Sequence, residues 1–160
     1  MGYPYRILFV CLGNICRSSA AEEVMRQKLV KAGLSDLVEV DSAGLIDFHE
    51  GELSDSRMRK HAKQRGYILT HRSRPITRGD YEAFDLIIGM DDQNIQRLRR
   101  GATTETELNK IHKMTEYFID KQSDSVPDPY YGGDSGFELV LDLLEDSCEG
   151  LIEKIRSQIT

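Results

Sequence analysis

The sequence lacks any long apolar run, because no stretch approaches the ~20 apolar residues that a membrane-spanning helix needs. Its three cysteines are an odd number and too few for a disulfide scaffold, so a reducing compartment is the simplest expectation. The first residues are too few and too polar for a signal peptide, and internal repeats, low-complexity tracts and interdomain linkers are absent. We therefore expect one cytoplasmic domain spanning residues 1–160.

Basic residues are outnumbered by acidic ones, 21 to 27, and the net charge is −6. This balance disfavours nucleic acids and anionic membranes as general partners. The basic residues Arg97, Arg99 and Arg100 are accordingly interpreted as a solvated helix end. Hydrophobic residues make up 39% and charged residues 30% of the chain, enough for a globular core. Any site for an anion must be built by local geometry, since the overall field repels anions.

Short apolar runs alternate with amphipathic stretches along the chain, which is typical of an α/β fold with a parallel sheet. A capping box from Ser135 to Glu138 is predicted at the start of the last helix. Strands are predicted over residues 5–10, 37–42, 84–90 and 110–118; helices over 18–32, 55–64, 91–99 and 135–159; and loops over 44–53, 101–109 and 123–133.

The segment from Cys11 to Ser18 joins the first predicted strand to the first predicted helix. Backbone N–H groups and the helix dipole converge at such a junction, which favours a bound phosphate and would stabilise a thiolate at Cys11. Arg17 can offer a bidentate fork to two phosphoryl oxygens, and Ser18 can donate its hydroxyl to the thiolate. Within the loop, Gly13 permits close backbone approach and Asn14 tolerates a left-handed turn.

Attack by a thiol on a phosphate ester also needs a proton for the leaving group, and a carboxylic acid on a loop is the usual source. Asp128 stands between two prolines that stiffen its presentation, and Tyr130 and Tyr131 can wall a slot for an aromatic ring. Taken alone, this segment is better explained by ordinary turn chemistry. The first loop alone is consistent with a buried small cysteine followed by a helix-start arginine.

Together, the segments at 10–18 and 128–132 closely resemble the low-molecular-weight protein tyrosine phosphatases, and the likeness covers nearly the whole chain. Asp41–Gly44, Thr70–His71 and Met90–Asp91 also match the family's pattern. The resemblance implies a single domain with a four-stranded parallel twisted sheet and helices on both faces. It also implies hydrolysis of phosphotyrosine in protein substrates through a cysteinyl-phosphate, with no metal or cofactor and with inhibition by phosphate or vanadate.

The resemblance further implies roles for individual residues. Cys11 is the nucleophile, Arg17 binds the phosphoryl group, and Ser18 eases the departure of sulfur. Asp128 protonates the tyrosyl oxygen and then activates water. The remaining phosphate-loop positions are Leu12, Gly13, Asn14, Ile15 and Cys16. A network that supports the loop is formed by Asn14, Ser42 and His71. The substrate pocket is lined by Phe48, Tyr130 and Tyr131.

One position departs from the family pattern, because Ser19 stands where a proline is usual. Cys16 is interpreted either as the partner of Cys11 in a protective reversible disulfide or as a spectator thiol. Cys148 lies on the apolar stripe of the last helix and is predicted to be in the core. No cysteine–histidine set has the spacing of a metal site, and three histidines are predicted to lie at the surface: His49, His61 and His112.

Several alternatives share parts of this pattern. A phosphoarginine phosphatase of the same fold would have a smaller polar Thr in place of Ile15. An arsenate reductase would need a pair of resolving cysteines after residue 80, which the sequence does not contain. A non-hydrolytic phosphocysteine carrier domain would have no use for Arg17 or Asp128. A binding-only relative is disfavoured because every catalytic position is filled. The oligomeric state is not indicated by the sequence.

Overall fold

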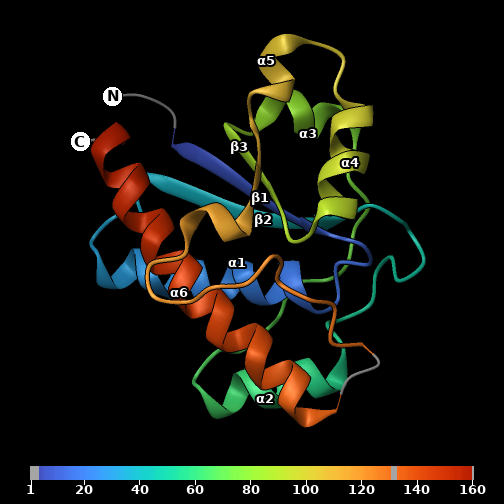
Figure 1. Cartoon of the computed structure of the whole chain (residues 1–160), viewed down its shortest axis with the longest axis vertical. Coiled ribbons are helices and arrows are strands. Elements are labelled where there is room, and N and C mark those ends of the chain that lie inside the picture. The colour runs from blue at the N-terminus through green and yellow to red at the C-terminus, as the bar shows by residue number, and fades with distance from the viewer. Residues whose placement is uncertain (1–3, 131–132, 160) are drawn as a thin grey trace.

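The structure, a computed structural model, describes residues 4–130 and 133–159 (Figure 1). A four-stranded sheet in the order β2–β1–β3–β4 forms its middle layer, and every neighbouring pair of strands is parallel. The strands are β1 (Tyr5–Cys11), β2 (Val38–Gly44), β3 (Leu86–Gly89) and β4 (Ile111–Lys113). The helices are α1 (Arg17–Lys31), α2 (Ser56–Gln64), α3 (Arg78–Ala83), α4 (Asp92–Gly101), α5 (Glu105–Leu108) and α6 (Asp134–Ile159), with the 3₁₀ helix η1 (Met114–Tyr117).

Alternate residues of β1 face two separate apolar cores. Ile7 and Phe9 pack into the layer formed by α1, α2 and α6, whereas Leu8 and Val10 pack into the layer that contains α3 and α4 (Figure 1). All four side chains are fully buried, which explains why the strand reads as a continuous apolar run. The prediction of a single-domain α/β fold with a parallel sheet between two helical layers is confirmed. None of the helices in the described residues is long and apolar enough to cross a bilayer.

Several predicted boundaries need correction. The segment 101–109, predicted to be a loop, contains the short helix α5, which Thr104 caps by accepting a hydrogen bond from the Glu107 N–H. Helix α3 was not predicted; it starts at a capping box made by Thr77 and Asp80. The predicted strand over 110–118 is a three-residue strand followed by η1.

The start of α6 and one histidine also differ from prediction. The helix begins at Asp134, so Ser135 lies inside it rather than at its cap, and Glu138 bonds His61 and Arg65 of the α2 region instead. His61, predicted to lie at the surface, is 6% exposed. It occupies the buried face of α2, three residues after Met58.

The carboxyl ends of the parallel strands meet at one edge of the sheet, where ligands bind in folds of this type. Gly44, the last residue of β2, lies directly against the loop after β1. A Cβ at Gly44 would stand 3.1 Å from the Leu12 carbonyl oxygen, so a larger residue would force the loop to shift. The Leu45 N–H then donates to the Cys11 and Leu12 carbonyls, and the loop is thereby fixed to the neighbouring strand.

We predict that Gly150→Ala destabilises the fold, although alanine normally favours a helix over glycine by about 1 kcal/mol. Gly150 lies in α6, where an added Cβ would stand 1.9 Å from the Tyr117 carbonyl oxygen. Overpacking against backbone should lower the free energy of unfolding by about 1–3 kcal/mol, measured by urea denaturation. Glu153→Ala, at an exposed position of the same helix, is the control and should change it by less than about 0.5 kcal/mol. Equal stability of both variants would contradict the packing described here.

Candidate active site

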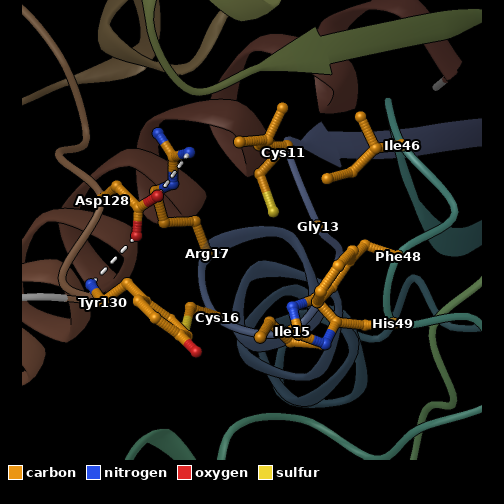
Figure 2. A pocket seen from close by; sticks show the side chains of 11 residues that line it. Cys11, Gly13, Ile15, Cys16, Arg17, Ile46, Phe48, His49, Asp128 and Tyr130 are labelled. Carbon is orange, nitrogen blue, oxygen red and sulfur yellow. Dashed lines mark hydrogen bonds and ion pairs between the residues drawn. The ribbon is translucent and has the colours of Figure 1, made fainter.

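A pocket of about 220 Å³ opens at the carboxyl edge of the sheet (Figure 2). The Cys11 sulfur points into it from the end of β1, with Arg17 and Asp128 on one side and Phe48 on the other. The lining residues are Cys11, Leu12, Gly13, Ile15, Cys16, Arg17, Ile46, Phe48, His49, Asp128 and Tyr130. The structure therefore brings together the predicted loop, the predicted acid and two of the predicted wall residues, which lie far apart in the sequence.

The hydroxyl of Ser18 is oriented toward the Cys11 sulfur. Ser18 Oγ lies 3.0 Å from Cys11 Sγ, and the Ser18 N–H donates to the same sulfur at 3.4 Å. Asn14 Nδ2 donates to Ser18 Oγ at 2.8 Å. Because that oxygen already accepts a hydrogen bond, its own proton is available to the sulfur. Two donors thus converge on a sulfur whose residue is 3% exposed, which is the arrangement that stabilises a thiolate.

The guanidinium of Arg17 is buried beside the sulfur and held from behind. Its Nη1 donates to Asp91 Oδ2 at 2.7 Å and to the Val126 carbonyl at 3.1 Å. Burial opposes the charge of Arg17, but Cys11 and Asp91 together raise its pKa. Asp91 Oδ1 caps α4 by accepting from the Asn94 N–H, so this carboxylate is itself fixed. The arginine is consequently charged and oriented before any ligand binds.

Asn14 holds the left-handed turn of the loop, with a φ of 59°. Its side-chain oxygen accepts from His71 Nε2 at 3.0 Å and from the Arg74 N–H at 3.1 Å, while its nitrogen donates to Ser18. Ser73 Oγ adds a hydrogen bond to the Gly13 carbonyl. The loop conformation is therefore fixed by side chains behind it rather than by the backbone alone.

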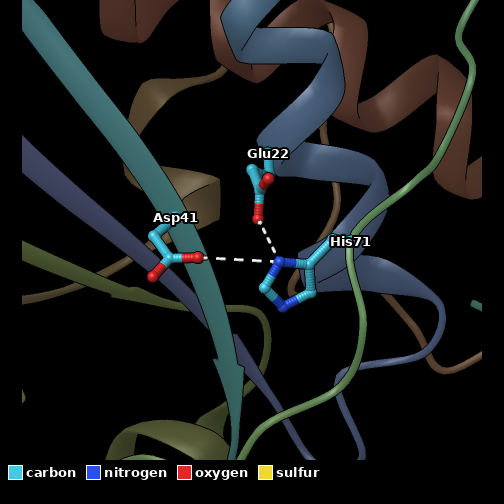
Figure 3. Close-up of side chains that lie close together, drawn as sticks. All are labelled: Glu22, Asp41 and His71. Atoms are coloured by element: carbon cyan, nitrogen blue, oxygen red, sulfur yellow. Dashed lines mark ion pairs between the residues drawn. The ribbon is translucent and has the colours of Figure 1, made fainter. Parts of the chain in front are cut away.

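Behind His71 lies a second set of contacts (Figure 3). His71 Nδ1 faces Glu22 Oε1 at 3.1 Å and Asp41 Oδ1 at 3.6 Å. Ser42 Oγ donates to the same Glu22 oxygen at 2.7 Å. The predicted network of Asn14, Ser42 and His71 is thus joined through Glu22, a residue that the sequence analysis did not include in it. The sequence feature that could have identified Glu22 as part of this network is its position one turn after Ser18, on the same buried face of α1.

The Glu22, Asp41 and His71 cluster has ligand-type atoms within 4.8 Å of one another. Its side chains are nevertheless engaged by protein partners. Arg74 Nη2 pairs with Asp41 Oδ2 at 3.0 Å, Ser42 donates to Glu22, and His71 reaches the phosphate loop. The arrangement serves as a hydrogen-bonded support for the loop.

Aromatic side chains form the rim of the pocket. Phe48 is 78% exposed and packs edge-to-face on His49, with ring centroids 4.9 Å apart. His49, predicted to lie at the surface, lines the pocket. On the opposite side, Asp128 Oδ1 accepts from the Tyr130 N–H at 3.0 Å, and Asp128 Oδ2 lies 3.8 Å from Arg17 Nη2. Tyr131, the other predicted wall residue, lies outside the described residues.

The remaining cysteines are buried thiols. Burial first, and the neighbouring Cys11 second, raise the pKa of the Cys16 thiol. Cys148 is fully buried in the core, as predicted. Ser19, at the position of the family's proline, is also buried: its hydroxyl donates to the Cys16 carbonyl at 3.3 Å and accepts from Ser54 Oγ at 2.8 Å.

Comparison with known proteins agrees with this geometry. A low molecular weight protein-tyrosine-phosphatase of Streptomyces coelicolor is 41% identical over 157 residues, which cover 97% of this chain and 96% of that protein. The crystal structure of a protein tyrosine phosphatase from Entamoeba histolytica, with Hepes in its active site, has a TM-score of 0.94 at 45% identity and covers 96% of this chain and 98% of that one.

A drosophila arginine phosphatase has a TM-score of 0.87 at 33% identity and covers 94% of this chain and 97% of that one. Residues 6–160 match the family described as low molecular weight phosphotyrosine protein phosphatase. Members of that family are hydrolases that act through a phosphorylated cysteine. On these matches, which extend over nearly the whole sequence, the chain belongs to the low-molecular-weight protein tyrosine phosphatase family.

Proposed function

We propose that this chain hydrolyses phosphotyrosine in protein substrates, with Cys11 as the nucleophile and Asp128 as the acid and base. The observation that carries the proposal is the pocket itself: a sulfur at the floor, a charged guanidinium and a carboxylate beside it, and an aromatic rim. A phosphorylated aromatic ring suits this arrangement. With its phosphorus near the Cys11 sulfur, the ring would lie at the rim beside Phe48 and Tyr130.

In the first step, the Cys11 thiolate attacks phosphorus, the S–P bond forms, and the bond from phosphorus to the tyrosyl oxygen breaks. Arg17 and the loop N–H groups hold the equatorial oxygens while charge develops on them. Protonated Asp128 gives its proton to the departing tyrosyl oxygen, so tyrosine leaves as the neutral phenol. The position of Asp128 Oδ2 beside Arg17 suits it for this transfer.

In the second step, Asp128 removes a proton from water, and the water oxygen attacks the phosphocysteine. The S–P bond breaks, the thiolate and inorganic phosphate result, and Asp128 is again protonated. The Ser18 hydroxyl, directed to the sulfur by Asn14, stabilises the negative charge that returns to Cys11. Phosphate and vanadate are expected to inhibit by occupying the same loop.

Phosphoarginine is the second candidate substrate, because a structural relative is an arginine phosphatase. Ile15 favours phosphotyrosine: it is apolar, lines the pocket and is 8% exposed, whereas the phosphoarginine enzymes of this fold are expected to have Thr there. Arsenate reduction is disfavoured, since Cys148 is the only cysteine after residue 80 and is fully buried.

The central test is hydrolysis of a simple aryl phosphate in the presence of a chelator. The unaltered protein should turn over in a vanadate-sensitive manner, and Cys11→Ser should reduce turnover to background, because an alcohol at this site is a far weaker nucleophile than a thiolate. Cys148→Ser, a core thiol outside the pocket, is the matched control and should retain activity if it folds. Metal-independent turnover by Cys11→Ser would refute the covalent route.

The acid is tested by Asp128→Asn, which keeps side-chain size and an oxygen to accept from the Tyr130 N–H. Turnover of phosphotyrosine should fall about 10²–10⁴-fold, because general acid–base catalysis contributes this much. Binding of vanadate should persist, since Cys11 and Arg17 remain. Asp124→Asn, at an exposed position earlier in the same loop, should be near normal. An unchanged rate for Asp128→Asn would assign the acid to another residue.

Substrate choice is tested by Ile15→Thr. The smaller polar side chain should lower kcat/KM for phosphotyrosine and raise it for phosphoarginine, shifting their ratio by about 10-fold or more, the effect of roughly one methylene-sized change in a pocket. Steady-state kinetics with both substrates give the ratio. If the unaltered protein already prefers phosphoarginine, the phosphotyrosine assignment is wrong while the covalent chemistry stands.

A further inference from the structure

His61 is a buried titratable residue that the proposed chemistry does not use. It lies in α2 and faces the first turns of α6, against which α2 packs (Figure 1). Its Nδ1 contacts Glu138 Oε2, and its Nε2 lies 3.2 Å from Asp134 Oδ1. The ring stacks on Phe137, with centroids 5.7 Å apart and an interplanar angle of 4°. The imidazole is therefore held on three sides by residues of a single helix.

Each ring nitrogen of His61 faces one carboxylate of α6. Hydrogen bonds from Arg65 and then from His61 hold the pKa of Glu138 below its usual value, so this partner is ionised. Asp134 lies in the first turn of α6, and its side chain is 85% exposed. His61 thus bridges two carboxylates in the first turns of α6.

Arg65 forms ion pairs further along α6 with Glu138, which it shares with His61, and with Asp142 and Glu145. Among residues 4–130 and 133–159, only His61 forms an ion pair with Asp134. The first residue of α6 therefore depends on His61 for its ionic attachment to α2, whereas the following turns also have Arg65.

The beginning of α6 is in turn packed against the segment that carries the proposed acid. Gly136, in the first turn of the helix, lies next to Pro129, the residue directly after Asp128: a Cβ at Gly136 would be 3.7 Å from Pro129 Cβ. The Arg57 guanidinium stands 4.9 Å from the Phe137 ring and 5.4 Å from the Tyr130 ring, which links the helix to the pocket wall.

The other end of this segment is fixed independently. The Val126 N–H donates to the Met90 carbonyl at 2.9 Å, and the Val126 carbonyl accepts from Arg17. Asp128 therefore lies between an anchor at Val126, provided by the end of β3, and an anchor at Pro129, provided by the first turn of α6. The first anchor belongs to the arginine site, and the second depends on how α6 is held.

We propose that His61 is a positioning residue that, by bridging Asp134 and Glu138, fixes the first turn of α6 to α2 and thereby holds Asp128 and Tyr130 over the pocket. The inference rests on the acid role proposed for Asp128. Its consequence is specific: loss of the bridge should impair proton transfer to the leaving group more than it impairs phosphate binding or attack by sulfur.

The test compares two aryl phosphates that differ in their need for an acid. Phosphotyrosine expels a poor leaving group, whereas 2,4-dinitrophenyl phosphate expels an anion that needs no proton. The variants are His61→Gln, whose two N–H donors share one nitrogen and cannot replace the two separate ring nitrogens that span the carboxylates, and Asp134→Asn, which removes one carboxylate at an exposed position. Asp142→Asn is the matched control, because it removes an α6 carboxylate that pairs with Arg65 and not with His61.

We expect His61→Gln to lower kcat/KM for phosphotyrosine about 10-fold, and Asp134→Asn about 3-fold, with less than 2-fold loss for the dinitrophenyl ester, where 10-fold corresponds to about 1.4 kcal/mol. Asp142→Asn should leave both values near those of the unaltered protein. Equal losses for both esters would show that His61 only stabilises the fold and would overturn the proposal, as would no loss in either variant. If His61→Gln does not fold, Asp134→Asn alone decides.

Asp128→Asn in the same assay separates this inference from the proposed function. A selective loss for phosphotyrosine in Asp128→Asn, without one in the His61 and Asp134 variants, contradicts the positioning role alone. Absence of selectivity in Asp128→Asn contradicts the acid assignment itself, and with it the basis of the inference.

Discussion

The active site depends on one backbone constraint, the left-handed conformation of Asn14. Left-handed turns of this kind can direct successive backbone N–H groups to one side of a loop, and a residue other than glycine adopts the conformation at a cost. The Asn14 side chain offsets that cost by using both ends of its amide: the oxygen accepts from His71 and Arg74, and the nitrogen donates to Ser18. The same interaction that holds the turn therefore also directs the Ser18 hydroxyl to the Cys11 sulfur.

Around this loop, the positions of individual charged side chains matter more than the net charge of the chain. The chain carries a net charge of −6, yet the pocket has a buried cation, because Arg17 is held between Asp91 and the Val126 carbonyl. The carboxylates of Glu22 and Asp41 stand behind the loop, where they face His71 instead of the incoming phosphate. An anion in this pocket would therefore meet a nearby positive charge in an otherwise acidic protein, since near charges dominate over distant ones.

The sequence predicted those parts of the structure whose signal is local. The strand ending at Cys11, the loop after it and the apolar stripe of α6 are patterns within consecutive residues. Asp91 and Val126 could not be found in this way, because they meet Arg17 across 74 and 109 positions. His61 is a different case: its spacing of three from Met58 placed it on the buried face of α2, and its polar nature led to the wrong prediction.

The departure at Ser19 shows how α2 joins the two halves of the site. Proline would fix the first turn of α1 through its ring, whereas Ser19 bonds the Cys16 carbonyl and Ser54 instead. Ser54 leads into Asp55, whose N–H donates to the Ile15 carbonyl and whose side chain caps α2. At one end, α2 is therefore tied to the phosphate loop. Through His61 it contacts α6, the helix that follows Asp128, so α2 connects the segment that carries Cys11 with the segment that carries Asp128.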